Sequence, residues 1–530
     1  MRRNQGFASR APYRPAGAMG APVRRRGSWA GVFDVGVLIA AIIAASIMYV
    51  MTLGESFALP LLCVVLYLNA LVAAVGLFLA MGKSAPLFVV TFFFNFVFFG
   101  LAPLQQIADG WRVILAEPEA TATVATLCVL FNLAGLAALA MRTNPRAPVP
   151  RGVWGRSVLA IPRPRLVKGL KRLLLVVGPL TLVFIALYNV HLFTTREDFT
   201  NRFSSLFPRE LAITVLAMIH PFVFIGAFVG LCVAWRLKSR ELMIIFGIVF
   251  AMTALIYSPL VAARFRSSAM IAFVLMMIVG WNRARILFVF LAAGVFAAPA
   301  LNAFRYAAGN ASAEFSEVRP LRQFFVGMDF DAFTMTCYII KYVQEFSVDF
   351  GNSALSAFLY VVPRAIWSGK SDHVPKLIYD FLAFEAGTNI DNLSSPPIAE
   401  GYFAFAFPGA ILAIVLFYLL IYKIEQWAAN AEFLSPSQML ACVVPMYVLI
   451  LLRGALVVGV SEMSGAMMAL VGVLLLLGAL KAAPATAPSH QRNGPRRPPV
   501  GPGRYAPVPA RHPASAPVAG PASTHHPVAD

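Results

Sequence analysis

Long runs of apolar residues, separated by short polar connectors, recur along most of the chain. We count about twelve, near 30–52, 57–81, 84–104, 120–141, 171–190, 211–235, 242–262, 268–281, 285–302, 401–422, 438–459 and 462–480. An α-helix needs about 20 such residues to cross a hydrocarbon core of about 30 Å. The pattern therefore predicts an all-α, polytopic transmembrane helix bundle of about 12 spans.

The longest connector, residues 303–400, lies between the ninth and tenth runs. Loops of this length are usually functional or disordered, and aromatic stretches such as FFVGMDFDAFTMTCYIIKYVQEF argue against disorder. We expect amphipathic or half-inserted helices over the membrane mouth. The domain prediction is a disordered basic arm (1–29), a transmembrane domain (30–480) that includes this loop, and a disordered Pro/Ala-rich tail (481–530).

Composition agrees with a membrane protein. Hydrophobic residues make up 59% of the chain and charged residues only 13%, against about 25% charged residues in soluble domains. The formal charge of +19 lies mainly in short connectors and in the two tails. The Lys and Arg residues therefore indicate which connectors are cytoplasmic, and no nucleic-acid partner is expected.

Lys and Arg divide the connectors into two sets. One set mixes acids with bases and comprises 53–56, 105–119, 191–210, 263–267 and 303–400. The other is basic and includes Arg24 to Arg26, Lys83, Arg142 to Arg172, Arg236 to Arg240, Arg283, Arg285, Lys423 and Arg496 with Arg497. Because cytoplasmic loops retain positive charge, we predict that both termini are cytoplasmic and that loop 303–400 is periplasmic.

Motifs of soluble enzymes are missing from the sequence. It contains no P-loop, no GxGxxG after a strand, no HExxH and no paired CxxC. Four of the five cysteines fall inside apolar runs, without the spacing of a metal site. Nucleotide and metal chemistry are therefore unsupported, and we predict no metal and no cofactor.

Several cations stand at the predicted outer ends of spans: Arg264, Arg266, Arg305, Arg364, Lys370 and Arg453. The positive-inside bias does not explain Arg264 and Arg266, and arginine binds phosphate through two parallel hydrogen bonds. Interfacial anchoring is the alternative for this pair. Placing the Arg453 guanidinium within the apolar run LILLRGALVVG costs several kcal/mol of free energy unless the group is paired or faces water. The two non-functional explanations for Arg453 are that its side chain reaches outward to water or that it pairs with Glu462.

Further polar residues could complete such a site. Glu400 precedes the span that begins GYFAFAF, where a carboxylate serves either as a general base or as a counter-ion for the arginines. Asp391 and Asn392 are candidates for positioning ligand hydroxyls. Asp372 and His373 flank Lys370, but a histidine in an exposed loop is more often inert.

The segment LYVVPRAIWSGKSD, followed by NLSSPPIAEGYFAFAFPGA, resembles the O-antigen polymerase family, the oligosaccharide repeat-unit polymerases of bacterial surface polysaccharide pathways. The resemblance rests on Pro363, Arg364, Trp367, Lys370, Ser395, Pro396, Glu400 and Gly409. One departure is Ala406-Phe407-Pro408, where the family has an Asn-Phe-Gly-like stretch.

The resemblance implies a GT-C-like membrane glycosyltransferase of the bacterial inner membrane. It would transfer a growing glycan from undecaprenyl diphosphate to the non-reducing end of another lipid-linked repeat unit, without a metal. In that reaction Glu400 deprotonates the acceptor hydroxyl. The diphosphate and its leaving-group charge are held by Arg264, Arg266, Arg305 and Arg453, while Arg364 and Lys370 order the loop or hold diphosphate.

Three alternatives remain. An O-antigen ligase has similar architecture and transfers finished glycan to a lipid A-core or protein acceptor. A transporter or flippase for lipid-linked oligosaccharide should place charges deep within several spans, whereas here they gather at the outer ends. A non-enzymatic scaffold would use loop 303–400 as an interaction surface. The expected partners are lipid-linked oligosaccharide, membrane lipids and a chain-length regulator.

Overall fold

The computed structural model describes residues 28–55, 60–109, 118–142, 154–193, 205–206, 215–258, 264–306, 324–325, 330–362, 364, 366–386, 394–429 and 431–480. Throughout these ranges the regular structure is helical and no strand occurs. The chain divides into two units, Met1–Lys481 and Ala482–Asp530, and every described residue belongs to the first. The predicted all-α class is confirmed.

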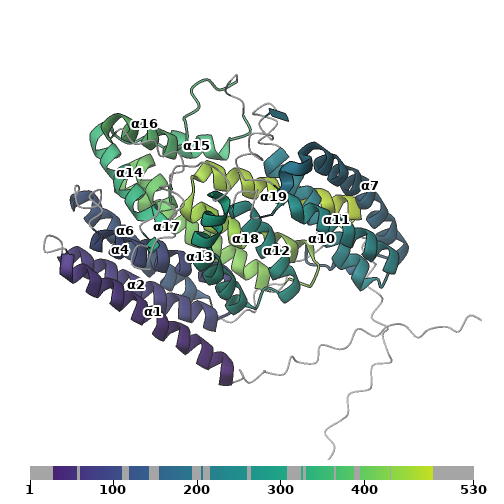
Figure 1. Ribbon diagram of the computed structural model, residues 1–530, viewed down its shortest axis with the longest axis horizontal. Helices are drawn as coiled ribbons and strands as arrows, with labels where there is room; N and C mark the ends of the chain where they lie inside the picture. Colours follow the sequence, from purple (N-terminus) through teal and green to yellow (C-terminus); the bar gives the residue numbers. More distant parts are fainter. Residues whose placement is uncertain are drawn as a thin grey trace, which may run out of the picture. The chain divides into compact units, whose positions relative to one another are not determined.

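A helix lies in each apolar run (Figure 1). The bounds are α1 Ser28–Glu55, α2 Pro60–Gly82, α3 Pro86–Phe96, α4 Ala102–Ala108, α6 Pro118–Met141, α7 Arg163–Tyr188, α10 His220–Arg236, α11 Arg240–Ile256, α12 Arg264–Val279, α13 Ala284–Tyr306, α17 Pro397–Ala429, α18 Pro436–Arg453 and α19 Leu456–Leu477. Within the described ranges, nine helices are long and apolar enough to cross a membrane. The chain is therefore a multi-pass membrane protein, while the count of twelve and the side of the termini stay predictions.

The helix formed by α3, a π-helical turn (Val97–Leu101) and α4 is buried along its whole length. The π-helical turn disturbs the regular hydrogen bonding, and the Asn69 amide donates to the carbonyl of Phe99 at 2.8 Å. Asn132 donates to Asn69 at 2.7 Å, and Asn95 donates to Asn132 at 2.9 Å. These asparagines join α2, α3 and α6, because polar side chains in an apolar medium must find partners.

The structure corrects one predicted boundary. The apolar runs 438–459 and 462–480 suggested a connector at 460–461, but α18 ends at Arg453 and α19 begins at Leu456. Hydropathy could not locate this turn, since apolar residues stand on both sides of it. Gly454 takes an extended conformation, with φ −89° and ψ 178°, that ends α18. Arg453 is thus the last residue of a helix and does not lie within one.

Helix α17 is broken near its start. Phe405 and Ala406 are non-helical, and Ala406 has a φ of 53°, which is costly for a residue with a Cβ. Pro408 follows and cannot donate a helical hydrogen bond. Across the break, a Cβ added to Gly409 would lie 2.1 Å from the carbonyl oxygen of Gly401. The first segment of α17, which carries Glu400, is therefore set apart from the long remainder.

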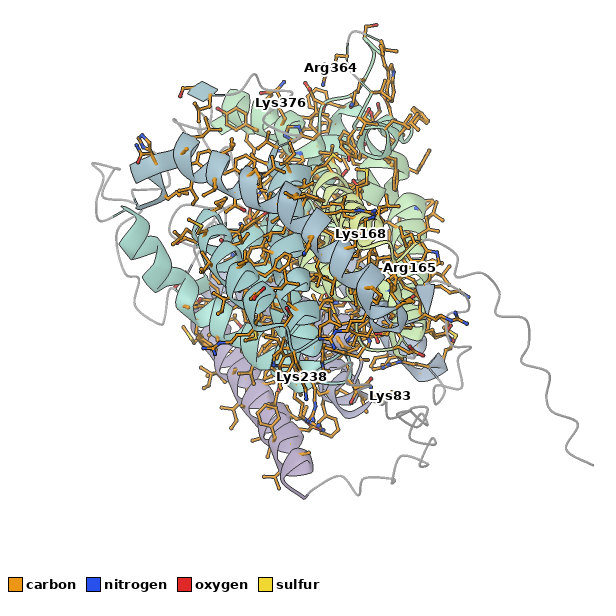
Figure 2. All side chains as sticks on the ribbon, turned by 90° about the vertical axis from the view of Figure 1, so that its right-hand side faces the viewer. Lys83, Arg165, Lys168, Lys238, Arg364 and Lys376 are labelled. Atoms are coloured by element: carbon orange, nitrogen blue, oxygen red, sulfur yellow. The ribbon has the colours of Figure 1, made fainter. Side chains whose placement is uncertain are left out.

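The described part of loop 303–400 contains three helices: α14 Ala332–Phe346, α15 Asn352–Phe358 and α16 Val374–Ala386. Helix α14 packs on α6 and α17, and α15 packs on α19. Figure 1 shows the three helices gathered together. In Figure 2, Arg364 and Lys376 of this region lie far from Lys83 and Lys238, which belong to the basic set of connectors.

Candidate functional site

The turn between α18 and α19 holds Glu400 in place. The backbone N–H of Leu456, the first residue of α19, donates to the Glu400 carboxylate at 3.1 Å. First-turn N–H groups have no partner within their own helix, and the helix dipole favours a negative charge at this end. The carbonyl of Arg453 accepts a hydrogen bond from the Ser395 N–H at 2.9 Å. The first turn of α17 and the residues just before it are thereby attached to the turn at two points.

Asp331 lies beside the same turn, immediately before α14. Its carboxylate accepts hydrogen bonds from the Ser394 N–H, at 3.1 Å, and from the Ser394 hydroxyl. It lies 3.9 Å from the Arg453 guanidinium, whose side chain is 30% exposed. Burial raises the pKa of Asp331, although Arg453 and Ser394 both oppose the shift. We refer to Asp331, Ser394, Ser395, Glu400 and Arg453 as the Arg453 cluster.

A second charged pair lies deeper along α19. Arg266 of α12 donates from Nε to Glu462 at 3.0 Å, and its Nη2 contacts the same carboxylate oxygen. The Arg266 side chain is 23% exposed and that of Glu462 only 6%. Glu462 follows Leu456 by six residues, which places it about 9 Å further along the helix axis. It pairs with Arg266 and not with Arg453, which lies at the turn beside Asp331.

Two polar atoms beside this pair lack a hydrogen-bond partner among the described residues. They are the second carboxylate oxygen of Glu462 and the hydroxyl of Tyr257, both buried. Tyr257 and Tyr447 interact electrostatically with Glu462 and Arg266. Buried polar atoms in proteins are normally satisfied, so this pair of open groups can receive a water or a ligand hydroxyl. We refer to Arg266, Glu462, Tyr257 and Tyr447 as the Arg266 cluster.

A buried His–Tyr pair borders the Arg266 cluster. The Tyr188 hydroxyl lies 2.9 Å from His220 Nε2, and the His220 ring lies 6.4 Å from the Tyr257 ring. His220 follows a π-helical turn (Val215–Ile219) against which α19 packs closely, since a Cβ on Gly465 would lie 2.0 Å from the Ala217 oxygen. Sequence reasoning missed these residues. The available signal was polar side chains within apolar runs.

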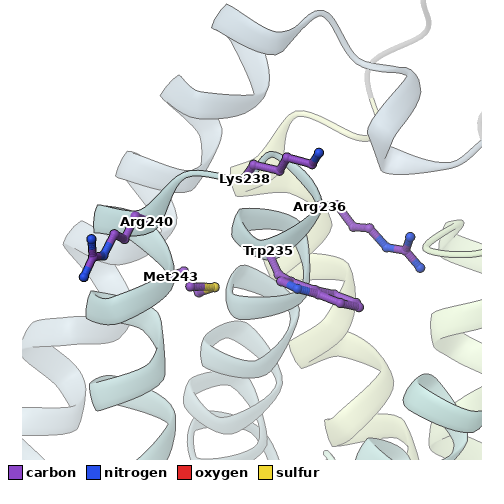
Figure 3. Close-up of a pocket in the computed structure, with 5 residues that line it drawn as sticks. All are labelled: Trp235, Arg236, Lys238, Arg240 and Met243. Atoms are coloured by element: carbon purple, nitrogen blue, oxygen red, sulfur yellow. The ribbon is translucent and has the colours of Figure 1, made fainter.

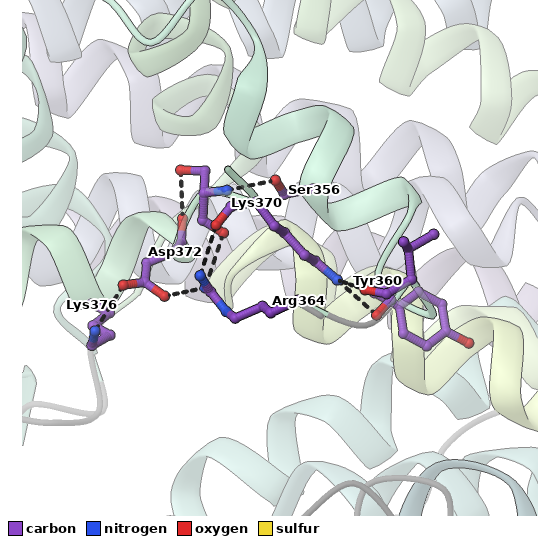
Figure 4. Close-up of polar contacts among 8 residues, drawn as sticks. Ser356, Tyr360, Arg364, Lys370, Asp372 and Lys376 are labelled. Carbon is purple, nitrogen blue, oxygen red and sulfur yellow. Dashed lines mark hydrogen bonds and ion pairs between the residues drawn. The ribbon is translucent and has the colours of Figure 1, made fainter. Parts of the chain in front are cut away.

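Arg364 and Lys370 order their own loop (Figure 4). The Lys370 ammonium donates to the carbonyls of Tyr360, Val362 and Leu359 at 2.8, 3.0 and 3.2 Å, which occupies its three donors. Arg364 donates to the carbonyl of Lys370 at 2.8 Å and contacts Asp372. Partial burial, with Arg364 nearby, lowers the pKa of Lys370. Of the two expected roles, these contacts favour loop ordering.

The loop is also joined to α19, because the Tyr360 hydroxyl lies 2.9 Å from the Ser464 hydroxyl. Four other predicted site residues have no described side chain. Arg264 begins α12 and Arg305 lies in the last turn of α13, while Asp391 and Asn392 fall outside the described residues. Over the part of the chain that is described, no group of three or more His, Cys, Asp or Glu residues could hold a metal ion.

Comparison with known proteins adds no relative. No family model, no curated protein and no solved structure matches this chain.

Proposed function

We propose that this protein is a membrane glycosyltransferase that polymerises undecaprenyl-diphosphate-linked oligosaccharide repeat units at the periplasmic face of the bacterial inner membrane. The main support is the Arg453 cluster, in which a partly exposed guanidinium and a helix-capping carboxylate share one turn beside the helices of loop 303–400. The resemblance of the segments around Arg364 and Glu400 to the O-antigen polymerases supports the same assignment.

In the proposed reaction the acceptor hydroxyl oxygen forms a bond with the anomeric carbon of the donor glycan. The bond between that carbon and the diphosphate oxygen breaks, and the diphosphate leaves with the bonding electron pair. Arg453 would stabilise the charge that develops on the leaving group. Glu400 would accept the hydroxyl proton, since it is a buried carboxylate held by a single backbone donor from α19.

The test uses purified protein in proteoliposomes supplied with lipid-linked repeat units. We expect a ladder of products without nucleotide sugar or added divalent metal. Movement of substrate between leaflets without a ladder would instead indicate a flippase. Transfer only to an added lipid A-core acceptor would indicate a ligase.

Two substitutions test the assigned residues. Glu400→Gln keeps a hydrogen-bond acceptor for Leu456 but removes the base, and Arg453→Lys keeps the charge but removes the planar fork. Each should reduce elongation by about 100-fold or more while leaving thermal unfolding nearly unchanged. Glu345→Gln on α14 is the control, because its carboxylate is 39% exposed and forms an ion pair with Lys341 of the same helix. Full elongation by both site variants would show that the reaction occurs elsewhere.

A further inference from the structure

Helix α15 and the turn after it expose apolar side chains, although they belong to the connector 303–400. Phe350, Phe358 and Val361 are 77%, 64% and 65% exposed. The whole segment 350–363 contains no charged residue. Exposed apolar surface that is continuous in this way marks a site of contact with a ligand, another protein or a membrane.

The two faces of α15 reverse the pattern of a water-soluble helix. The buried positions are Ser353, Ser356 and Ala357, and the helix packs on α17 and α19. Leu355 and Phe358 are exposed and, three residues apart, are neighbours on the opposite face. A soluble amphipathic helix buries its apolar stripe, whereas helices in lipid turn small residues toward one another. The outer face of α15 therefore suits contact with acyl chains.

The same face lies beside the first turns of two candidate spans. The Tyr360 hydroxyl lies 2.9 Å from the hydroxyl of Ser464, which follows Leu456, the first residue of α19, by eight residues and so lies about 12 Å further along the helix axis. A Cβ added to Gly351 would lie 3.0 Å from the Phe405 ring of α17, which is itself exposed. The apolar surface of α15 is therefore continuous with that of the spans.

The turn after α15 has its backbone carbonyls satisfied from within the loop. The Lys370 ammonium donates to the carbonyls of Leu359, Tyr360 and Val362, and Figure 4 shows its side chain extended toward Tyr360. Water would hydrate these carbonyls at a polar surface, whereas in hydrocarbon each needs a donor from the protein. One ammonium that serves three carbonyls of an apolar turn suits a turn shielded from water.

The turn between α10 and α11 shows how a connector in water differs. It carries Arg236, Lys238 and Arg240, and Figure 3 shows Arg236 and Arg240 extended to opposite sides. Charged side chains resist transfer into hydrocarbon, so such a turn stays at the hydrated surface. The segment 350–363 has no charge of its own that would hold it there.

We propose that residues 350–363 insert into the leaflet around the α18–α19 turn and contact its acyl chains, with Lys370 supplying the hydrogen bonds that water gives elsewhere. A protein partner would account for the exposed side chains. It would not account for their continuity with the surface of α17 or for the three carbonyls bound by Lys370. The proposal is independent of the reaction assigned to the Arg453 cluster, and its test needs no measurement of activity.

The experiment measures the depth of nitroxide labels on the purified full-length protein in vesicles of phosphatidylcholine and phosphatidylglycerol. Power saturation compares collisions with oxygen, which concentrates in the bilayer, against collisions with a water-soluble nickel chelate. The test positions are Phe358→Cys and Val361→Cys. Asp380→Cys, exposed on α16 of the same loop, is the water reference, and Leu412→Cys, exposed on α17, is the lipid reference.

All labels are placed in a Cys232→Ser background, since the other four cysteines are buried. The unmodified background, treated with the same reagent, reports any labelling of those four. Lys370→Met is then added to the Phe358→Cys and Leu412→Cys proteins. It removes the donor to the three carbonyls while leaving the apolar residues of the turn in place.

We expect both test labels to collide more with oxygen than with the nickel chelate, as Leu412→Cys does, and Asp380→Cys to show the reverse. Lys370→Met should raise the nickel collisions at Phe358→Cys toward the Asp380→Cys value and leave Leu412→Cys unchanged. Test labels that match Asp380→Cys would overturn the proposal. Low collisions with both reagents would overturn it in favour of burial against a second copy of the chain. An unchanged label at Phe358→Cys in the Lys370→Met protein would overturn the role of Lys370.

Discussion

The two ends of α17 hold buried carboxylates in contrasting surroundings. Near the last turn, Glu425 is fully buried and accepts a hydrogen bond from the Leu87 N–H at 2.6 Å and one from the Trp281 indole at 3.3 Å. It also pairs with Arg142 at 3.2 Å. Near the first turn, Glu400 accepts a backbone hydrogen bond from Leu456 and lies beside the turn that carries the partly exposed Arg453.

The contacts of Arg142 make the Glu425 region a closed network. Arg142 donates to the Lys83 carbonyl at 3.1 Å, and Lys83 donates to the Leu139 carbonyl at 2.7 Å. No buried side-chain atom of these residues lacks a partner in the described structure, whereas Glu462 and Tyr257 of the Arg266 cluster, further along α19 from Glu400, each have one. A network in which every buried polar atom has a protein partner holds helices together. A network with unpartnered polar atoms can accept hydrogen bonds from, or donate them to, a ligand. This difference supports a structural role for Glu425 and agrees with the role proposed for Glu400.

The largest expected effect is on stability at the closed end. Glu425→Ala leaves Arg142 buried without its counter-ion, with a side chain only 10% exposed. Removing one partner of a buried pair typically costs about 3–5 kcal/mol. We expect that loss in detergent unfolding, with elongation reduced only in proportion to the folded fraction.

Glu432→Ala serves as the control for Glu425→Ala. Glu432 lies after α17 and accepts from the exposed Ser157 N–H at 3.0 Å, so its loss should cost less than about 1 kcal/mol. A cost for Glu425→Ala no larger than that of Glu432→Ala would contradict the structural role of the closed network.

An intermediate effect is expected in the Arg266 cluster. Glu462→Ala should cost about 2 kcal/mol, between the values for exposed and buried pairs, because water reaches part of Arg266. Adding Arg266→Ala removes the uncompensated charge, so the double variant should recover part of that stability. If the cluster takes part in catalysis, the stabilised double variant still fails to elongate glycan. Recovery of elongation together with stability would assign the cluster to folding alone.

Sequence pattern predicted the helices but not their polar pairings. Apolar runs are local, so hydropathy locates α2 or α6 to within a few residues. Arg453 and Glu400 were also accessible, since Arg453 is a charge that interrupts an apolar run and Glu400 is a charge just before one. Asp331 was missed because its contacts with Ser394 and Arg453 span long sequence separations. Arg142 was interpreted as a topology signal, and only the fold shows that it neutralises Glu425.

The smallest expected effect is the pH response of the loop that faces the open end. The hydrogen bond from Lys376, at 2.8 Å, lowers the pKa of Asp372, and Arg364 acts in the same direction. A lowered pKa gives stability that is present above the unfolded value of about 3.9 and is lost as the pH falls below it. Because the pair is partly exposed, we expect its loss to reduce the stability of the loop by less than about 1 kcal/mol.

Limited proteolysis should therefore cut residues 364–376 faster at pH 3 than at pH 6 in the wild type, using an acid-active protease normalised to a denatured control. Asp372→Asn should abolish that difference, and an unchanged pH response in this variant would show that another group controls the loop.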